Sequence, residues 1–253
     1  CESFSEYKKV EEIRKKYELN SNLKPISYNT ETLVMNYFDN WENPIKTFYP
    51  SIDEKIGSLQ GGDILILAGA TGMGKTCMML NLMMSMAKNK IKILLFSLEM
   101  TLSQLQNRII SAELNIDSNK VRNFQMTDDE RNRYIDYACS KPFEHLDVNV
   151  CTDYNLTIEK LRDTVLSNES DIIFVDYLGL IKSEIKGNSY ERVSEISRDL
   201  KLLALECNKP FIVLHQLNRI PPDRKEKRPE LSDLRDSGKI EQDADFICFV
   251  YLL

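Results

Sequence analysis

A glycine-rich stretch has the residue types and spacing of a phosphate-binding loop. The pattern G-x-x-x-x-G-K-[ST] is met by Gly69, Gly74, Lys75 and Thr76. Glycines at these points let backbone N–H groups close around phosphate oxygens, and a helix that begins after the loop adds its positive end. The alternative is a glycine turn that binds nothing. We predict that the nucleotide contacts are Gly69, Thr71, Gly72, Met73, Gly74, Lys75, Thr76 and Cys77.

An aspartate closes a second apolar run. Ser170-Asp-Ile-Ile-Phe-Val-Asp176 is typical of a buried strand that ends in a carboxylate. Hydrolysis at a phosphate-binding loop requires such a carboxylate, which holds Mg²⁺ beside the loop hydroxyl. We therefore expect Asp176 and Thr76 to hold Mg²⁺, directly or through water. An aspartate that only caps a loop is the alternative.

A second acid is needed to orient the attacking water. The residue after Asp176 is Tyr177, so the adjacent glutamate that many ATPases use is missing. The candidate is Glu99, which ends the strand after the phosphate-loop helix, because neighbouring parallel strands deliver their C-terminal ends to one crevice. The alternative for Glu99 is a place at the start of the helix near Thr101.

A third apolar run, at 210–215, delivers further polar groups to the same edge of the sheet. Gln216 is placed to contact a γ-phosphate, and Asn218 and Arg219 follow it. His215 is expected to be a packed residue at the strand end rather than a base.

These residues require a scaffold of alternating strands and helices. The apolar runs predict an α/β fold with a mostly parallel sheet that is covered on both faces. The predicted strands are 63–68, 91–97, 147–151, 171–176, 210–215 and 245–252, and the predicted helices are 75–88, 101–115, 127–140, 156–167 and 190–207. An exposed charged helix is expected at 5–19. Residues 20–51 are either a linker that docks by its aromatic residues or part of the same core.

Length and composition limit the possible classes of protein. The 253 residues are 42% hydrophobic, with a formal net charge of −6, which argues against a protein that coats nucleic acid over its whole surface. Six scattered cysteines without a C-x-x-C pair predict reduced thiols, and hence the cytoplasm or an equivalent reducing compartment such as an organelle matrix. The last apolar run, Phe246 to Leu253, is far shorter than the roughly 20 residues of a membrane span. A soluble piece of a longer protein is expected.

Six segments carry a shared pattern: 69–76, 96–100, 175–180, 195–201, 215–219 and 228–245. Together they resemble the C-terminal motor domain of DnaB-type replicative helicases from about residue 50 onward. The resemblance implies a RecA-like P-loop NTPase fold, ATP with Mg²⁺, a homohexameric ring, and 5′-to-3′ travel on single-stranded DNA. A primase and a helicase loader are the implied partners. On this view, 1–50 is an N-terminal helix and linker, and 51–253 is the motor domain.

The resemblance also implies residue roles. Lys75 and Thr76 serve the phosphates and the metal, Glu99 is the catalytic acid, Asp176 is the metal-side acid, and Gln216 senses the γ-phosphate. Arg235, Asp236 and Gly238 correspond to a segment that touches the DNA backbone. Aspartate at 236 replaces the usual glutamate, and histidine at 215 replaces the usual serine. The family's arginine-finger segment is expected beyond Leu253, so the fragment alone is expected to hydrolyse ATP weakly.

Two loops are candidates for contact with DNA. The basic, proline-bounded run 220–229 contributes Arg224, Lys225 and Arg228, and the loop 182–190 follows the strand of Asp176. In a ring, both would face a channel whose positive charge tracks phosphates without reading bases. Solvated loops are the alternative. An ATP-driven DNA motor is therefore the leading hypothesis, against a RecA-like regulatory or assembly ATPase that acts on a protein partner, or a nucleotide-binding module without turnover.

Overall fold

The computed structural model describes residues 44–183, 188–217, 224 and 228–252, without the side chains of 189–190 and 235–238. By contacts the chain divides into two compact units, 1–44 and 45–253. Almost all of the first unit lies outside the described residues. The helix expected at 5–19, and most of the segment 20–51, therefore stay predictions.

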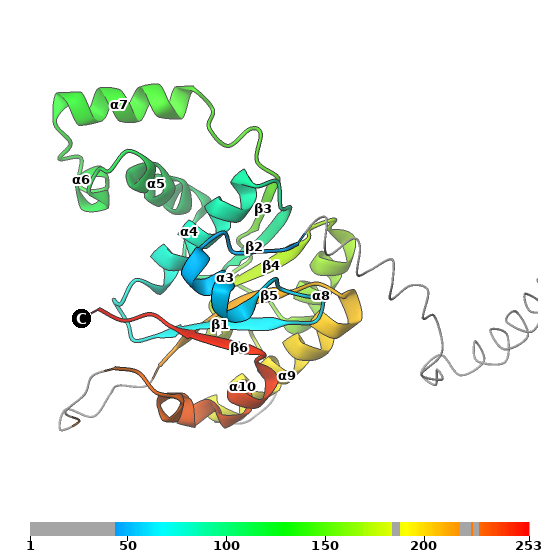
Figure 1. Cartoon of the computed structure of the whole chain (residues 1–253). Coiled ribbons are helices and arrows are strands. Elements are labelled where there is room, and N and C mark those ends of the chain that lie inside the picture. Colours follow the sequence, from blue (N-terminus) through cyan, green and yellow to red (C-terminus); the bar gives the residue numbers. More distant parts are fainter. Residues whose placement is uncertain (1–43, 184–187, 218–223, 225–227, 253) are drawn as a thin grey trace, which may run out of the picture. The chain divides into compact units, whose positions relative to one another are not determined.

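Six parallel strands form one sheet in the described domain, as the sequence predicts (Figure 1). Their order is β3-β2-β4-β5-β1-β6, and every recorded pairing is parallel. The strands are β1 (Ile64–Gly69), β2 (Ile93–Ser97), β3 (Val148–Cys151), β4 (Ile172–Asp176), β5 (Phe211–Gln216) and β6 (Phe246–Phe249). The last strand is shorter than the predicted 245–252, although the Val250 amide just after it still donates to the Ala68 carbonyl at 2.8 Å.

The helices include the five that the sequence predicts, within one to two residues at most ends. The α-helices are α3 (Pro50–Ile56), α4 (Lys75–Lys88), α5 (Leu102–Glu113), α6 (Ser118–Arg122), α7 (Asp128–Cys139), α8 (Ile158–Ser167), α9 (Ser189–Cys207) and α10 (Gly238–Asp243). Two 3₁₀ segments are η1 (Leu178–Leu180) and η2 (Leu231–Ser237). Within the described part of the chain, no helix is long and apolar enough to cross a membrane.

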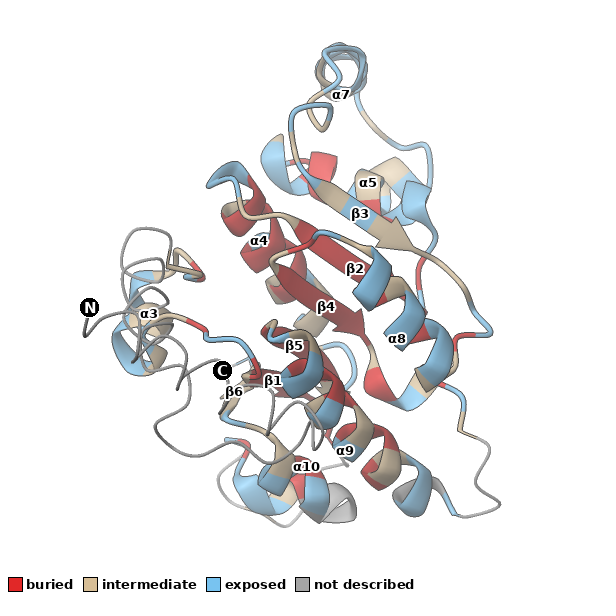
Figure 2. Cartoon of the chain, turned by 90° about the vertical axis from the view of Figure 1, so that its right-hand side faces the viewer, coloured by how far each residue is buried: buried red, intermediate tan, exposed pale blue. Residues whose placement is uncertain are grey.

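The sheet separates two apolar cores. Along β4, Ile173 and Val175 pack with α8 and α9, whereas Ile172 and Phe174 pack with α4 and α5. Figure 2 shows the buried strands in red, with α4 on one side of the sheet and α8 and α9 on the other. Alternation of this kind follows from the two-residue period of a strand, and burial on both faces explains the continuous apolar runs in the sequence.

The chain enters the domain through aromatic contacts. Phe48 and Tyr49 lie directly before α3, and they pack with Ile52 and Ile56 on the core that α4 covers. No residue of α3 itself is buried. The described end of the segment 20–51 thus docks by its aromatic residues.

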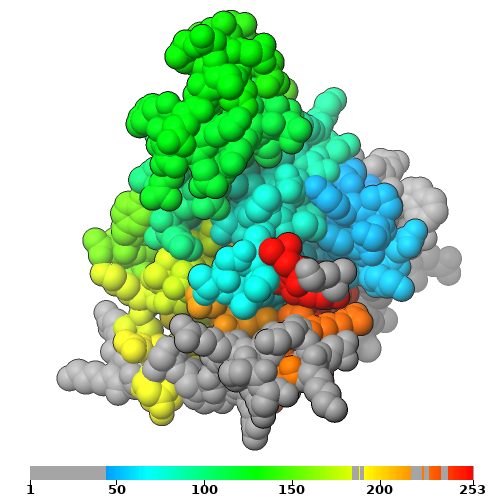
Figure 3. Space-filling model, turned by 90° about the vertical axis from the view of Figure 1, so that its left-hand side faces the viewer, coloured from blue at the N-terminus to red at the C-terminus, as the bar shows by residue number. Residues whose placement is uncertain are grey.

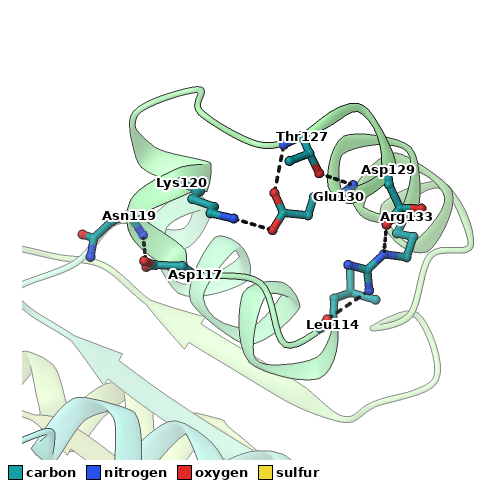
Figure 4. A network of polar contacts seen from close by, with 8 residues as sticks. All are labelled: Leu114, Asp117, Asn119, Lys120, Thr127, Asp129, Glu130 and Arg133. Carbon is teal, nitrogen blue, oxygen red and sulfur yellow. Dashed lines mark hydrogen bonds and ion pairs between the residues drawn. The ribbon is translucent and has the colours of Figure 1, made fainter.

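The segment from α6 to α7 stands away from the sheet and is held by polar contacts. None of the residues of α7 is buried, and Figure 3 shows the segment from α5 to α7, in green, projecting at one end of the domain. Figure 4 shows the bonds that organise it. Lys120 Nζ lies 2.7 Å from Glu130 Oε1, Thr127 closes a capping box with Glu130, and Arg133 donates to the Leu114 carbonyl at 3.3 Å.

A charged clamp joins α9 to the amino ends of β1 and β6. Lys201 Nζ donates to the Gly62 carbonyl at 2.8 Å and to Asp245 Oδ2 at 2.6 Å. The same carboxylate oxygen accepts from the Ile64 amide at 2.8 Å. Because both charges are mostly buried, at 23% and 35% side-chain exposure, the pair is screened less than a surface pair. The clamp fixes the strand that leads into the phosphate-binding loop.

We expect Lys201→Met to destabilise the domain by about 1–3 kcal/mol, because it leaves the Asp245 carboxylate and the Gly62 carbonyl without their charged partner. The matched control is Lys92→Met, since Lys92 lies 3.8 Å from the almost fully exposed Glu169 and such pairs contribute about 0–1 kcal/mol. Urea unfolding followed by circular dichroism measures both losses. Equal losses in the two variants would show that the clamp is an ordinary surface pair.

Candidate nucleotide site

The connection between β1 and α4 forms an open loop around a helix N-terminus. Gly72 and Gly74 have φ angles of 80° and 88°, in the left-handed region that favours glycine. A Cβ atom at either position would meet nothing within 4 Å, so open space adjoins the loop. Gly74 is the N-cap of α4, and the first turn of α4 contains no acidic residue. The loop thus offers backbone donors and a positive helix end to an anion.

Lys75 places its ammonium within this loop. Its Nζ donates to the carbonyls of Gly69 at 2.7 Å and Ala70 at 2.9 Å. Partial burial lowers the pKa of Lys75, while the carboxylates of Asp176 and Glu99 act in the opposite direction. The ammonium and both acids therefore share one electrostatic environment.

Asp176 is the most buried ionisable group of the site. It ends β4 with 1% of its surface exposed. Burial raises its pKa to about 6; Glu99 adds to this effect, while the Thr76 hydroxyl and the charges of Arg108 and Lys75 oppose it. Its Oδ2 atom is buried and has no hydrogen-bond partner in the described part of the chain.

An unpartnered carboxylate oxygen beside a threonine hydroxyl fits a Mg²⁺ ion. Mg²⁺ prefers oxygen ligands, and it is usually held by one or two carboxylates together with substrate phosphates rather than by an all-protein cage. Among the described residues there is no group of three or more acids, histidines or cysteines that could hold a metal ion without such a ligand. Asp176 and Thr76 thus have the chemistry that the predicted metal site requires.

Glu99 lies at the same edge because β2 and β4 pair in register. Ser97 is paired with Asp176, and the Leu98 amide donates to the Asp176 carbonyl at 2.8 Å. The buried Ser97 hydroxyl donates to the Met100 carbonyl at 2.8 Å and closes the turn that carries Glu99. The Glu99 side chain is exposed, and its charge acts on Asp176.

The alternative role of Glu99 at a helix start is taken by other residues. The N-cap of α5 is Thr101, whose side chain accepts from the Gln104 amide, while the Gln104 side chain accepts from the Thr101 amide. This capping box satisfies the first turn without Glu99. The Glu99 carboxylate is thus not needed to cap α5, and it remains available at the edge of the sheet where β2 and β4 end.

Gln216 connects the end of β5 to the phosphate-binding loop. It pairs in register with Gly69, and its Nε2 donates to Thr71 Oγ1 at 2.8 Å. Burial, with a contribution from the Lys75 charge, lowers the pKa of the neighbouring His215 to about 4. His215 is therefore neutral at pH 7, as expected for a packed strand-end residue. Asn218 and Arg219 lie outside the described residues.

The predicted DNA-contacting residues belong to a different part of the chain. Arg224 is engaged within its own segment, because its guanidinium donates to Asp233 at 2.7 and 2.9 Å and lies 2.9 Å from Glu230. Arg228 is exposed, and its carbonyl accepts from Arg224. Arg235 lies in η2, as does Asp236, and Gly238 begins α10. Their side chains and all of Lys225 are outside the description.

Two residues of the site were not predicted from the sequence. Arg108 of α5 acts on Asp176 with its charge, and Ser97 fixes the turn of Glu99. Neither belongs to a short motif with a chemical meaning. The available signals were a cation seven residues after the Thr101 cap, and a single serine at the end of an apolar run.

An all-parallel sheet with a phosphate-binding loop after β1 and acids after β2 and β4 defines a RecA-like P-loop NTPase fold. The family model for "DnaB-like helicase C terminal domain" matches residues 44–252. The chain belongs to this family, as the sequence motifs indicate.

Curated relatives and solved structures agree with this assignment. The chain is 37% identical to the replicative DNA helicase DnaB of Buchnera aphidicola over 214 residues, which are 82% of this chain and 46% of that protein. It is 35% identical to the Geobacillus stearothermophilus DnaB over 212 residues, 82% of this chain and 47% of that protein. The chain thus spans about half the length of these relatives.

Among solved structures, a separately solved ATPase domain superposes with a TM-score of 0.79 at 26% identity, over 90% of this chain and 84% of that chain. A DnaB-like replicative helicase, solved in a study of its interactions with primase, gives a TM-score of 0.73 at 25% identity. That comparison covers 98% of this chain and 68% of the other.

The raised pKa of Asp176 predicts a pH-dependent stability. Between about pH 4 and pH 6 the Asp176 carboxyl is protonated in the folded state and ionised in the unfolded state. The free-energy cost of burying the ionised carboxylate is therefore absent below this pH range and complete above it. We expect Asp176→Asn to be more stable than the wild type by about 2–3 kcal/mol above pH 6 in the absence of nucleotide and metal, with the difference vanishing near pH 4.

Urea titrations at a series of pH values measure this difference. The control is Asp136→Asn, at an exposed position of α7, where no burial penalty exists to remove. A stability difference between wild type and Asp176→Asn that stays constant from about pH 4 to about pH 7.5 would contradict the prediction.

Proposed function

We propose that this chain is the motor domain of a replicative DNA helicase, which couples ATP hydrolysis to 5′-to-3′ translocation on single-stranded DNA and to duplex unwinding. The observation that carries the proposal is the convergence of Lys75, Asp176, Glu99 and Gln216 at one edge of the sheet, in a chain of the DnaB-like family. Because the chain spans about half of its relatives, the activity belongs to the whole protein.

In this proposal, the loop from Gly69 to Cys77 binds the ATP phosphates. Its backbone N–H groups and the Lys75 ammonium take the anionic oxygens, which the open space beside Gly72 and Gly74 can admit. Asp176 and Thr76 would hold Mg²⁺. When bound, this ion neutralises charge on the phosphates of ATP.

Glu99 orients the attacking water and accepts its proton. Its carboxylate is exposed beside the buried Asp176, so it is accessible to water. Gln216 senses the γ-phosphate, since its bond to Thr71 already links β5 to the loop. Occupation of the loop is thereby communicated to the segment that follows β5.

The wider assembly follows from the family. We propose a homohexameric ring in which each site receives an arginine from the neighbouring subunit, with a helicase loader and a primase as partners. DNA phosphates contact the segment of Arg235, Asp236 and Gly238, and Lys225 and Arg228 add positive charge. Arg224 stabilises this segment through Asp233 and Glu230.

The five described cysteines are free thiols, which fits the cytoplasm or an equivalent reducing compartment.

We expect Glu99→Gln to retain ATP binding and to lower turnover by at least about 100-fold, because general-base catalysis contributes about 10²–10⁴. Lys75→Ala should instead weaken binding itself by at least about tenfold, since the phosphates lose their ammonium partner. Binding of a fluorescent ATP analogue and steady-state phosphate release, measured on the full-length ring, separate the two effects. Comparable turnover in Glu99→Gln and wild type would place the base elsewhere.

We expect Arg235→Ala, in the full-length ring, to weaken single-stranded DNA binding and to reduce the salt slope of log K by about one per lost phosphate contact. The matched control is Arg131→Ala on α7, whose guanidinium pairs with the exposed Asp128. Fluorescence anisotropy with oligonucleotides of different sequence measures affinity between about 50 and 200 mM salt, a range over which phosphate-dominated binding falls steeply. If Arg235→Ala kept the wild-type salt slope of DNA binding, and if DNA did not change the ATPase rate of the ring, the alternative of an ATPase that acts on a protein partner would be favoured.

A further inference from the structure

A pocket lies beside the phosphate-binding loop and shares only Cys77 and Arg108 with the site described above. It has a volume of about 240 Å³ and lies between α4 and α5. Its walls combine apolar side chains with polar and charged groups. The latter are Cys77 and Asn81 of α4, Arg108, Ser111 and Glu113 of α5, and Ser118 of α6.

Ser111 indicates that the pocket is suited to a ligand. The residue is 3% exposed, and its hydroxyl is buried without a hydrogen-bond partner in the described part of the chain. Leaving such a group unpaired costs about 1–3 kcal/mol. A ligand with a polar atom in this pocket would remove the penalty.

Cys77 supplies a reactive group at the same place. Its thiol is exposed, and Asn81 Nδ2 donates to its sulfur at 3.8 Å. Burial raises the pKa of Cys207 and of Cys248, so these thiols are less reactive at neutral pH. Cys139 is also exposed, but it ends α7 and does not line this pocket.

Arg108 adds a positive charge to the pocket, whose other charged lining residue, Glu113, is paired with Lys88 at 2.5 Å. The Arg108 side chain is exposed, and its charge also acts on the Asp176 carboxylate. A planar guanidinium of this kind can pair with a carboxylate through two parallel bonds. Cys77 and Arg108 thus present a thiol and a carboxylate receptor on facing helices.

We propose that this pocket is a site of reversible thiol modification, at which Cys77 forms a mixed disulfide with a small carboxylate-bearing thiol and the adduct excludes nucleotide from the phosphate-binding loop. The Cys77 thiolate attacks a low-molecular-weight disulfide, R–S–S–R. A bond forms between Cys77 and one sulfur, the original S–S bond breaks, and R–S⁻ leaves and takes up the proton. The disulfide is the two-electron oxidant, and excess R–SH reverses the exchange.

The exclusion of nucleotide follows from the position of Cys77. It comes directly after Thr76 in the first turn of α4, where the proposed phosphate contacts are made. An adduct on this residue brings bulk and carboxylate charge to the site of an anionic ligand. This part of the inference rests on the proposed function.

The test uses oxidised glutathione as a carboxylate-bearing probe and cystamine, which carries ammonium groups, as its counterpart. We expect about one glutathione per chain, located on Cys77 by peptide mass mapping, and an at least tenfold loss of affinity for a fluorescent ATP analogue. ATP with Mg²⁺ added first should protect Cys77, and free thiol should restore binding. In Cys77→Ser, the affinity should be the same before and after treatment.

Arg108→Ala tests the role of the pocket. We expect the ratio of the glutathione rate to the cystamine rate at Cys77 to fall at least fivefold in this variant, with the ratio at Cys139 unchanged. Modification of Cys139 in preference to Cys77, an unchanged rate ratio, or full nucleotide affinity in the modified protein would each overturn the proposal. Failure of the reduced protein to bind the ATP analogue would count against the proposed function, whereas the mapping and the rate ratio judge the modification site itself.

Discussion

A buried negative charge at the end of a central strand is the constraint on which the site depends. Asp176 is 1% exposed, and burial raises its pKa to about 6, so at pH 7 the fold carries an ionised group that it has removed from water. The nearby cations, Lys75 and Arg108, offset only part of this cost. One carboxylate oxygen still has no partner among the described residues. The fold thus contains a buried carboxylate with an oxygen that a metal cation could bind.

The register of the sheet brings the other groups to this charge. Ser97 pairs with Asp176, so β2 and β4 end level, and Gly69 pairs with Gln216, so β1 and β5 end level; because Val175 pairs with Val213, the second pair of strands extends beyond the first at the same edge of the sheet. At the opposite end of β1, the Lys201–Asp245 clamp fixes the strand before it enters the loop. A shift of one residue in either pairing would turn the alternate side chains to the wrong core, which makes the register costly to change. Apolar packing therefore determines where the polar groups lie.

The sequence was most informative where one local pattern has one structural meaning. The long apolar runs predicted the strands and helices, and the glycine pattern located the loop, because both depend on neighbouring residues only. The short helices α3, α6 and α10 were missed, since five to seven residues carry too little periodicity. Arg108, and the clamp between Lys201 and Asp245, depend on long-range contacts that no local spacing reveals. The pocket between α4 and α5 was unforeseen for the same reason.

The charges at this edge explain why nucleotide and metal should bind together. Asp176 and Glu99 provide two negative charges, and Lys75 and Arg108 provide two positive charges, of which the Lys75 ammonium already donates to two loop carbonyls. A triphosphate without a metal would still be repelled by the two carboxylates, and at an effective dielectric constant of about 20 each pair of unit charges about 4 Å apart contributes about 4 kcal/mol. On the proposed function, a divalent cation at Asp176 would offset this repulsion, because it would attract the phosphates and the buried carboxylate at once. The carboxylate that destabilises the empty fold is thus, on the proposed function, the group that would make nucleotide binding depend on the metal.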